Sequence, residues 1–229
     1  MFASQPLETR HTDMPTSSAS DNPQLTLEER LAHAPVRKLA SKEHLFCEGD
    51  PRIYVFRVEA GVITIYKTLC DGRRRIIDFA HPGEIIGLGA IEEHVLSAQA
   101  PRSAVVRCLS ASALESLAEA DATLALKLYK SVCQELAATR NLLVTLGQRS
   151  AIERLASFLM AVRRRAAGGG DTVMLTMRRS DIADLLGLTI ETVSRTLTKL
   201  RSMGVIEVEQ GGTTVKLCDV PRLVELANE

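Results

Sequence analysis

The segment between Ala111 and Leu146 constrains the fold of this chain more than any other feature, because it contains neither glycine nor proline. Alanine, leucine, lysine and glutamate dominate it, and all four favour the α-helix. A stripe of mostly apolar residues recurs along it in alternating steps of four and three: Ala125, Tyr129, Val132, Leu136, Thr139, Leu143 and Leu146. That spacing keeps one face of a helix against a partner helix. The segment therefore predicts a long helix that pairs two copies of the chain.

An alternative partner for this helix is the chain's own preceding domain. Leu124, Leu128 and Leu142 lie beside the stripe and widen the apolar face in that direction. A small domain is too short to cover the whole helix, so we expect a homodimer. The predicted dimer interface consists of Tyr129, Val132, Leu136, Thr139, Leu143 and Leu146.

The segment before the helix, residues 36–106, consists of short β-favouring runs separated by glycine, proline or aspartate. Gly61 and Asp71-Gly72 stand where hairpin turns need a positive φ. Many short strands with regular turn signals predict a small antiparallel barrel.

The segment after the helix changes character again. A helix is predicted over residues 150–165, and the glycine-rich run at residues 166–170 ends it in a loop. A strand over 173–177, two short helices around Gly187, and two strands across Gly211-Gly212 follow, and a helix over 221–227 closes the chain. This order predicts a winged helix-turn-helix.

We therefore predict an α+β protein with a tail over residues 1–24, a β-barrel over 25–120, a dimerisation helix over 121–147 and a winged helix-turn-helix over 148–229. The tail is rich in serine, threonine, proline and charge, and it has no continuous apolar stretch of the kind that a secretory signal needs. We expect it to be flexible. No apolar run approaches the roughly 18 residues that a membrane helix needs, so a cytoplasmic protein without a membrane partner is expected.

The residues from Arg179 to Leu200 have the pattern of a helix-turn-helix. Gly187 supplies the tight turn and Thr189 is placed to cap the second helix. The apolar residues of the two helices recur at helical spacing and are expected to face the core: Ile182, Ala183, Leu186, Val193, Leu197 and Leu200. The polar residues left on the outward face of the second helix are Glu191, Thr192, Ser194, Arg195 and Lys199.

This outward face suits the major groove of DNA. Glu191 can accept a hydrogen bond from the amine of cytosine, and Arg195 can donate two bonds to guanine. Ser194 can contact a base edge or a thymine methyl. The alternative is that Glu191 and Arg195 form an ordinary surface ion pair one turn apart. The preceding helix, the turn, the cap and the wing together favour double-stranded DNA as the partner.

Charge gives only modest support, because the whole chain has 28 basic and 28 acidic residues. Between Arg178 and Arg201, five basic residues face three acidic ones. The residues that we expect on the DNA backbone are Arg178, Arg179, Ser180, Thr189, Thr192 and Lys199. No catalytic constellation accompanies them, and the barrel histidines near acids, His81 and His94, suggest no enzyme; His94 is expected in a solvated loop.

Specific stretches of the chain resemble the Crp/Fnr superfamily, and within it the FNR and FixK branches, from Leu45 to Leu217. They are Leu45–Asp50, Val58–Val62, Asp71–Arg74, Pro82–Leu88, Glu153–Ala156 and Leu186–Arg195. The resemblance implies that the barrel is an effector domain of cyclic-nucleotide-binding type, that the long helix forms the dimer, and that the winged helix-turn-helix reads a palindrome. It also implies an activator that contacts RNA polymerase.

The FNR branch of this family uses a Glu-x-x-Ser-Arg pattern to read sites of the form TTGAT, four bases, ATCAA. Here the pattern falls on Glu191, Ser194 and Arg195. The cyclic-AMP receptor branch has Arg and Gly where this chain has Ile190 and Ser194, so the FNR type of specificity is expected. Relatives often place Thr or Ser where this chain has Arg178, and a cation there could add a phosphate contact at the expense of a helix cap.

Cofactor binding is not expected. The five cysteines, at positions 47, 70, 108, 133 and 218, have no C-x-x-C spacing, which argues against a disulfide framework and a compact zinc site. The first 46 residues contain none, so the FNR iron-sulfur cluster lacks its ligands. Cys47 and Cys108 are expected to be small buried apolar residues, and Cys133 is the one cysteine placed to cross-link partners.

A cyclic nucleotide is the alternative ligand. Arg102 and Ser103 resemble the phosphate-binding end of the family's cyclic-AMP cassette. The acid that holds the ribose hydroxyl in that cassette falls on Leu88, so the ligand would lose a partner. The expected behaviour is FixK-like, with activity that follows the amount of protein.

Overall fold

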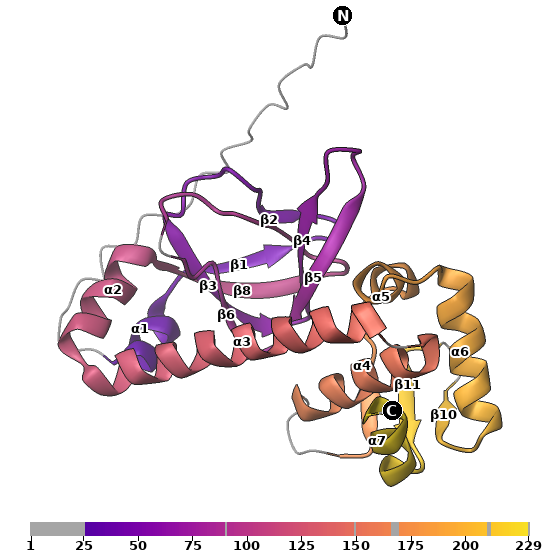
Figure 1. Cartoon of the computed structure of the whole chain (residues 1–229). Coiled ribbons are helices and arrows are strands. Elements are labelled where there is room, and N and C mark those ends of the chain that lie inside the picture. Colours follow the sequence, from indigo (N-terminus) through magenta and orange to yellow (C-terminus); the bar gives the residue numbers. More distant parts are fainter. Residues whose placement is uncertain (1–25, 90, 149, 166–169, 210–211, 229) are drawn as a thin grey trace, which may run out of the picture.

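The computed structural model describes residues 26–89, 91–148, 150–165, 170–209 and 212–228. The predicted tail at residues 1–24, most of the predicted loop at 166–170 and Gly211 of the predicted wing turn lie outside the described residues. Figure 1 shows three parts in chain order: a strand-rich domain, a long helix along one side of it, and a smaller second domain. Among the described helices, none combines the length and the apolar character required to cross a membrane.

The first domain, called the barrel domain below, is built from two antiparallel sheets with the strand orders β1-β8-β3-β6 and β2-β7-β4-β5. Its strands are β1 Val36–Leu39, β2 His44–Phe46, β3 Tyr54–Ala60, β4 Ile63–Thr68, β5 Arg74–Ala80, β6 Ile85–Ile86, β7 Ser97–Gln99 and β8 Ala104–Ser110. Side chains from both sheets, including Phe56, Ile63 and Val106, form one buried cluster. The predicted small antiparallel barrel is thereby confirmed, as two sheets around a shared core.

The two predicted hairpin glycines occupy the turns β3–β4 and β4–β5. Gly61 has φ +79° and Gly72 has φ +81°, a region that side chains other than glycine rarely adopt. At Gly61 there is a second constraint, because a Cβ atom would lie 2.6 Å from the carbonyl oxygen of Ser103. That hairpin therefore depends on glycine for both conformation and space.

The long apolar segment is not a single helix, contrary to the sequence-based expectation for residues 111–146. It divides at Asp121 into α2 Ala111–Ala120 and α3 Ala122–Gln148. The Asp121 carboxylate accepts hydrogen bonds from the backbone N–H groups of Thr123 at 2.8 Å and Leu124 at 3.2 Å. Aspartate competes with the helical backbone in this way and favours helix starts over helix interiors. α3 then coincides closely with the predicted dimerisation helix.

The second domain contains α4 Ala151–Arg165, β9 Thr172–Met174, α5 Arg179–Leu186, α6 Ile190–Ser202, β10 Ile206–Val208, β11 Thr214–Leu217 and α7 Val220–Asn228. A short helix, α1 Leu27–His33, precedes the barrel domain. The predicted strand at 173–177 is shorter and pairs with β11, so the wing is a three-stranded sheet of order β10-β11-β9. The predicted winged helix-turn-helix is confirmed.

The two domains share a hydrophobic core. Tyr66, Ile76 and Phe79 from the barrel domain belong to the same buried cluster as Phe158 on α4 and Leu186 on α5. Figure 1 shows α5 beside β5, at the end of α3. The orientation of the helix-turn-helix is therefore set by packing against the β4–β5 hairpin as well as by the chain connection.

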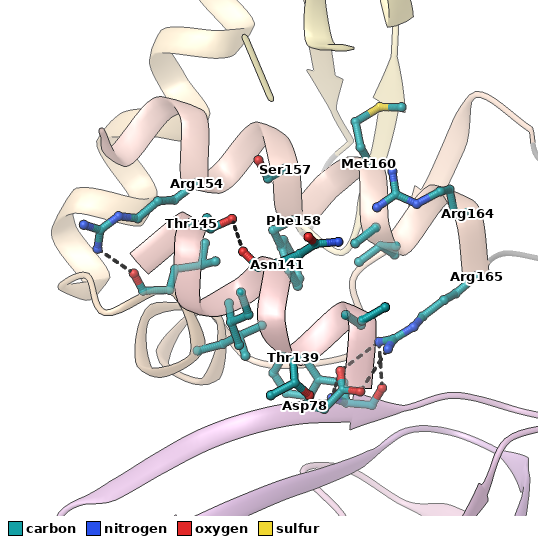
Figure 2. Close-up of a pocket in the computed structure, with 18 of the residues that line it drawn as sticks. Asp78, Thr139, Asn141, Thr145, Arg154, Ser157, Phe158, Met160, Arg164 and Arg165 are labelled. Carbon is teal, nitrogen blue, oxygen red and sulfur yellow. Dashed lines mark hydrogen bonds and ion pairs between the residues drawn. The ribbon is translucent and has the colours of Figure 1, made fainter. Parts of the chain in front are cut away.

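A cavity of about 660 Å³ lies at this junction, lined by β5, the second half of α3, and α4. Figure 2 shows Arg165 reaching Asp78 from α4, with two contacts of 2.9 Å between guanidinium and carboxylate. The Thr145 hydroxyl donates to the carbonyl oxygen of Asn141 at 2.8 Å, and Ser157 donates to that of Ala227 at 3.2 Å. Much of the polar lining is therefore already paired within the chain.

Candidate nucleic-acid interface

The helix-turn-helix begins with the predicted turn and cap. α5 ends at Gly187, which has φ +61° and ψ +39°, the left-handed conformation that glycine adopts readily. Thr189 then caps α6, because its hydroxyl oxygen accepts from the Thr192 N–H at 3.2 Å. Both structural predictions are confirmed.

The inward face of α6 is fixed by burial. Val193 and Leu200 have no exposed surface, and Leu197 is 4% exposed. They join Ile182 and Leu186 of α5 in the shared core. Because one side of the helix is committed to the core, the opposite side must face outward.

The outward side presents the three residues predicted to read bases. Glu191 and Arg195 are exposed, and Ser194 is half-buried. Lys199 is exposed and Thr192 is half-buried on the same side. The structure therefore brings the predicted set together on one accessible face of α6. Figure 1 shows this helix at the edge of the molecule.

Glu191 and Arg195 do not neutralise each other as an ion pair. The ion pairs of the described second domain join other residues, such as Arg163 to Asp171 and Lys216 to Glu207. The pKa of Glu191 is lowered by a hydrogen bond from its own backbone N–H and by the Thr189 hydroxyl, with a smaller contribution from the Arg195 charge. Glu191 is thus an ionised acceptor at the start of α6, and the Arg195 guanidinium remains a donor.

Arg179 lies between the recognition helix and the wing. Its Nη1 donates to the Ser194 hydroxyl oxygen at 3.4 Å. A Cβ atom placed on Gly212 would lie 2.9 Å from its Nη2. The guanidinium therefore occupies the space between α6 and the turn that precedes β11.

Arg178 is oriented differently from the other predicted backbone contacts. Its Nη2 donates to the hydroxyl oxygen of Ser41 in the barrel domain at 3.3 Å. The Arg178 side chain does not cap α5. The Asp181 carboxylate accepts from the Arg178 backbone N–H at 3.1 Å, which satisfies a different N–H group at the same helix start. A DNA contact by Arg178 stays a prediction, as do those of Ser180, Thr189 and Lys199.

Two arginines of β5, which sequence reasoning missed, hold α5 against the barrel domain. Arg74 Nη2 lies 3.6 Å from the buried Asp181 carboxylate, and the same guanidinium lies over the Tyr66 ring at 5.1 Å. Arg75 approaches the turn, within 3.2 Å of the position of a Cβ atom on Gly187. The run of arginines after Gly72 is visible in the sequence, but no nearby residue indicates that these arginines contact α5.

Cys108, Cys47 and His94 differ in how their positions match the sequence-based expectations. Cys108 is buried as predicted, and burial raises the pKa of its thiol to about 11. Cys47 is exposed, so its expected burial is wrong. His94 is not in a solvated loop: its side chain is 8% exposed and stacks on Phe46 with 3.7 Å between ring centroids. Burial lowers the pKa of this imidazole, which favours a neutral ring that packs in the core.

The predicted effector residues Arg102 and Ser103 are both exposed in the loop before β8. Leu88, at the position of the family's ribose-binding acid, is half-buried and packs against the cluster that contains Leu31 and Leu114. The loop thus offers a cation and a hydroxyl, while Leu88 supplies an apolar contact in place of an acid.

The predicted dimer stripe on α3 is mainly exposed. Tyr129 is 66% exposed, Leu143 67%, and Val132 and Leu136 are 48% exposed. Thr139 lines the junction cavity of its own chain and is half-buried, as is Leu146. Four of the six predicted residues therefore present an apolar surface that nothing in the described part of this chain covers.

Two family models match the chain, the Crp-like helix-turn-helix domain over residues 153–226 and the Cyclic nucleotide-binding domain over residues 36–121. The Nitrogen fixation regulation protein FixK of Bradyrhizobium diazoefficiens is 40% identical over 191 residues, covering 82% of this chain and 80% of that protein. The Transcriptional activatory protein AadR of Rhodopseudomonas palustris is 37% identical over 202 residues, covering 87% and 83%. Among solved structures, FixK2 from Bradyrhizobium japonicum matches with a TM-score of 0.79 at 37% identity, covering 84% of this chain and 96% of that one.

Proposed function

The chain belongs to the Crp/Fnr family of transcription regulators and is FixK-like, and from this premise we propose that it is a homodimeric activator that reads a palindrome of the form TTGAT, four bases, ATCAA. The observation that supports this most directly is the outward face of α6. It offers an ionised acceptor at Glu191 and a donor at Arg195 that is free of any carboxylate partner among the described residues. These are the groups that cytosine and guanine edges require.

Dimerisation supplies the second half of the palindrome. The exposed stripe of Tyr129, Val132, Leu136 and Leu143 on α3 is the surface that a second copy would cover. A twofold dimer presents its two recognition helices to successive major grooves about 34 Å apart, which is why the two half-sites are inverted copies.

Activation is proposed from the relatives. AadR is named a transcriptional activatory protein, and it shares 37% of its residues with this chain over the aligned region. An activator of this kind acts by contacting RNA polymerase once it is bound beside a promoter. We place the protein in the cytoplasm, where DNA and polymerase are.

No effector is required in this proposal. A cyclic nucleotide would need an acid for its ribose, and Leu88 stands at that position with its half-buried side chain packed against an apolar cluster. A site that leaves the ribose hydroxyl unpaired binds weakly, because a buried polar group without a partner costs about 1 to 3 kcal/mol. The purified protein is expected to bind the palindrome in air without added nucleotide. A strict requirement for cyclic AMP would favour the alternative, a nucleotide-responsive regulator.

The central test is the variant Arg195→Ala in a mobility-shift titration. Loss of a bidentate contact to guanine should weaken binding to the palindrome by about 1 to 3 kcal/mol and relax discrimination at that base pair. Arg201→Ala is the matched control, since Arg201 is an exposed cation at the far end of the same helix. It should weaken all duplexes equally. Equal binding by wild type and Arg195→Ala would refute the proposed role of α6.

A further inference from the structure

The Ser194 hydroxyl on the recognition helix is paired differently from the two threonine hydroxyls that follow it. Thr196 donates to the carbonyl oxygen of Thr192 at 2.7 Å, and Thr198 donates to that of Ser194 at 3.1 Å. This bond to the preceding turn is the usual position for a helical hydroxyl. Ser194 makes no such bond among the described residues, and its oxygen instead accepts from Arg179 Nη1 at 3.4 Å.

We propose that Arg179 is a positioning residue that makes Ser194 a hydrogen-bond donor to DNA, and this inference rests on the proposed function. A serine hydroxyl has one donor and two acceptor positions. Because arginine can only donate, it occupies an acceptor position of Ser194 and leaves the O–H to point elsewhere. The open direction is the exposed side of α6, so Ser194 reads a base acceptor, such as a purine N7, guanine O6 or thymine O4.

The wing completes this arrangement through Gly212. The Arg179 Nη2 atom lies 2.9 Å from the place where a Cβ on Gly212 would be, a distance that real Cβ contacts essentially never show. Any larger residue would therefore push the guanidinium, and with it the bond to Ser194. The wing thus contributes to base discrimination without touching the base, because it leaves room for Arg179, which orients Ser194.

This role differs from that of a simple phosphate contact. Removing an arginine that only attracts phosphate weakens binding to all duplexes equally and lowers the salt dependence of binding. An arginine that orients Ser194 changes the preference at the base pair that Ser194 reads. Discrimination at one base pair is therefore the informative measurement.

The experiment compares wild type, Arg179→Ala, Ser194→Ala and the double variant on labelled palindrome duplexes carrying each single base-pair substitution. Ser194→Ala identifies the pair that Ser194 reads, where we expect discrimination to fall about fivefold or more. Arg179→Ala should lower discrimination at that same pair by a similar factor, and the double variant should be no worse there than Ser194→Ala. Discrimination intact in Arg179→Ala, or additive losses in the double variant, would overturn the inference.

Glycine variants give a second test in which every donor is retained. Gly212→Ala should reproduce the loss of discrimination seen with Arg179→Ala. The matched control is Gly204→Ala, because Gly204 has φ +71° against +70° for Gly212 but has no atom within 4 Å of its Cβ position. Both variants have similar backbone strain, so a Gly212→Ala protein that discriminates like Gly204→Ala contradicts the inference. If wild type binds no palindrome better than a random duplex, the proposed function itself fails.

Discussion

Replacing Asp181 tests how the helix-turn-helix is held. This carboxylate is 5% exposed at the first turn of α5, where it accepts from the Arg178 backbone N–H at 3.1 Å. It also lies 3.6 Å from the Arg74 guanidinium of the barrel domain. Asp181 therefore both caps α5 and joins it to β5.

The expected cost of Asp181→Ala can be summed from these contacts. Loss of the cap costs about 1 kcal/mol, and loss of a negative charge at a helix start costs about 0.3 to 1 kcal/mol. The ion pair adds at most about 1 kcal/mol, because the Arg74 side chain is 38% exposed and can be hydrated when its partner is removed. The total is about 1.3 to 3 kcal/mol. Asp181→Asn retains an oxygen that can cap the helix, so it should lose only about half as much.

Thermal unfolding followed by far-UV circular dichroism measures the difference. For a chain of this size, the expected losses lower the midpoint by about 3 to 12 °C for alanine and clearly less for asparagine. All variants must be compared at one protomer concentration, because the midpoint of a dimer depends on it.

Asp184 provides the matched control on the same helix. Partial burial raises the pKa of Asp184, against the opposing charge of Arg74, so its ionised form is disfavoured in the fold. Asp184→Ala is therefore expected to be neutral or slightly stabilising at pH 7. Equal midpoints for Asp181→Ala and Asp181→Asn would refute the argument that the backbone cap contributes about 1 kcal/mol.

Three further outcomes are expected. Burial and the nearby Arg165 lower the pKa of His81 from 6.5 to about 4, so stability present above pH 6.5 should be lost, by about 3 kcal/mol, as the pH falls towards 4. Denaturant titrations of His81→Gln should show a flatter pH dependence, and parallel curves would contradict this assignment. Gly61→Ala should impair folding, because its Cβ would lie 2.6 Å from a backbone oxygen. Gly72→Ala, at an open turn with similar φ, should cost only about 1 kcal/mol. Equal melting temperatures for the two variants would be inconsistent with the clash. Leu143→Asp should give a monomer by light scattering. Lys127→Asp, which changes another exposed residue of α3, should stay dimeric. A dimeric Leu143→Asp protein would place the interface elsewhere.

Much of the local architecture was readable in the sequence. Gly187 and Thr189 marked the turn and the cap, and the spacing of Val193, Leu197 and Leu200 identified the buried side of α6. Each of these signals depends on residues within one or two helical turns, where backbone geometry fixes which side chains share a face. The outward position of Glu191 and Arg195 followed directly.

The sequence-based predictions that were wrong each missed a contact, either with a nearby backbone group or with a distant side chain. Asp121 interrupts the long helix because its carboxylate caps α3, and His94 is buried because Phe46 lies opposite its ring. The exposed fraction of Thr139 differs from that of Leu143 because α3 also packs on its own chain. Periodicity identified the helix, but it could not show which apolar residues of α3 pack on the same chain and which remain exposed for a second copy.

Only the tertiary structure decided how the two domains meet. Arg178 contacts Ser41 across a separation of 137 positions, and Arg165 contacts Asp78 across 87. Such pairs arise from the docking of whole elements through a shared apolar core, and no short-range spacing encodes them. The sequence determined which side of α6 is buried and which polar residues it exposes, because those depend on neighbours along the chain. The docking of distant elements decided that Arg74 and Arg75 of β5 hold α5 against the barrel domain.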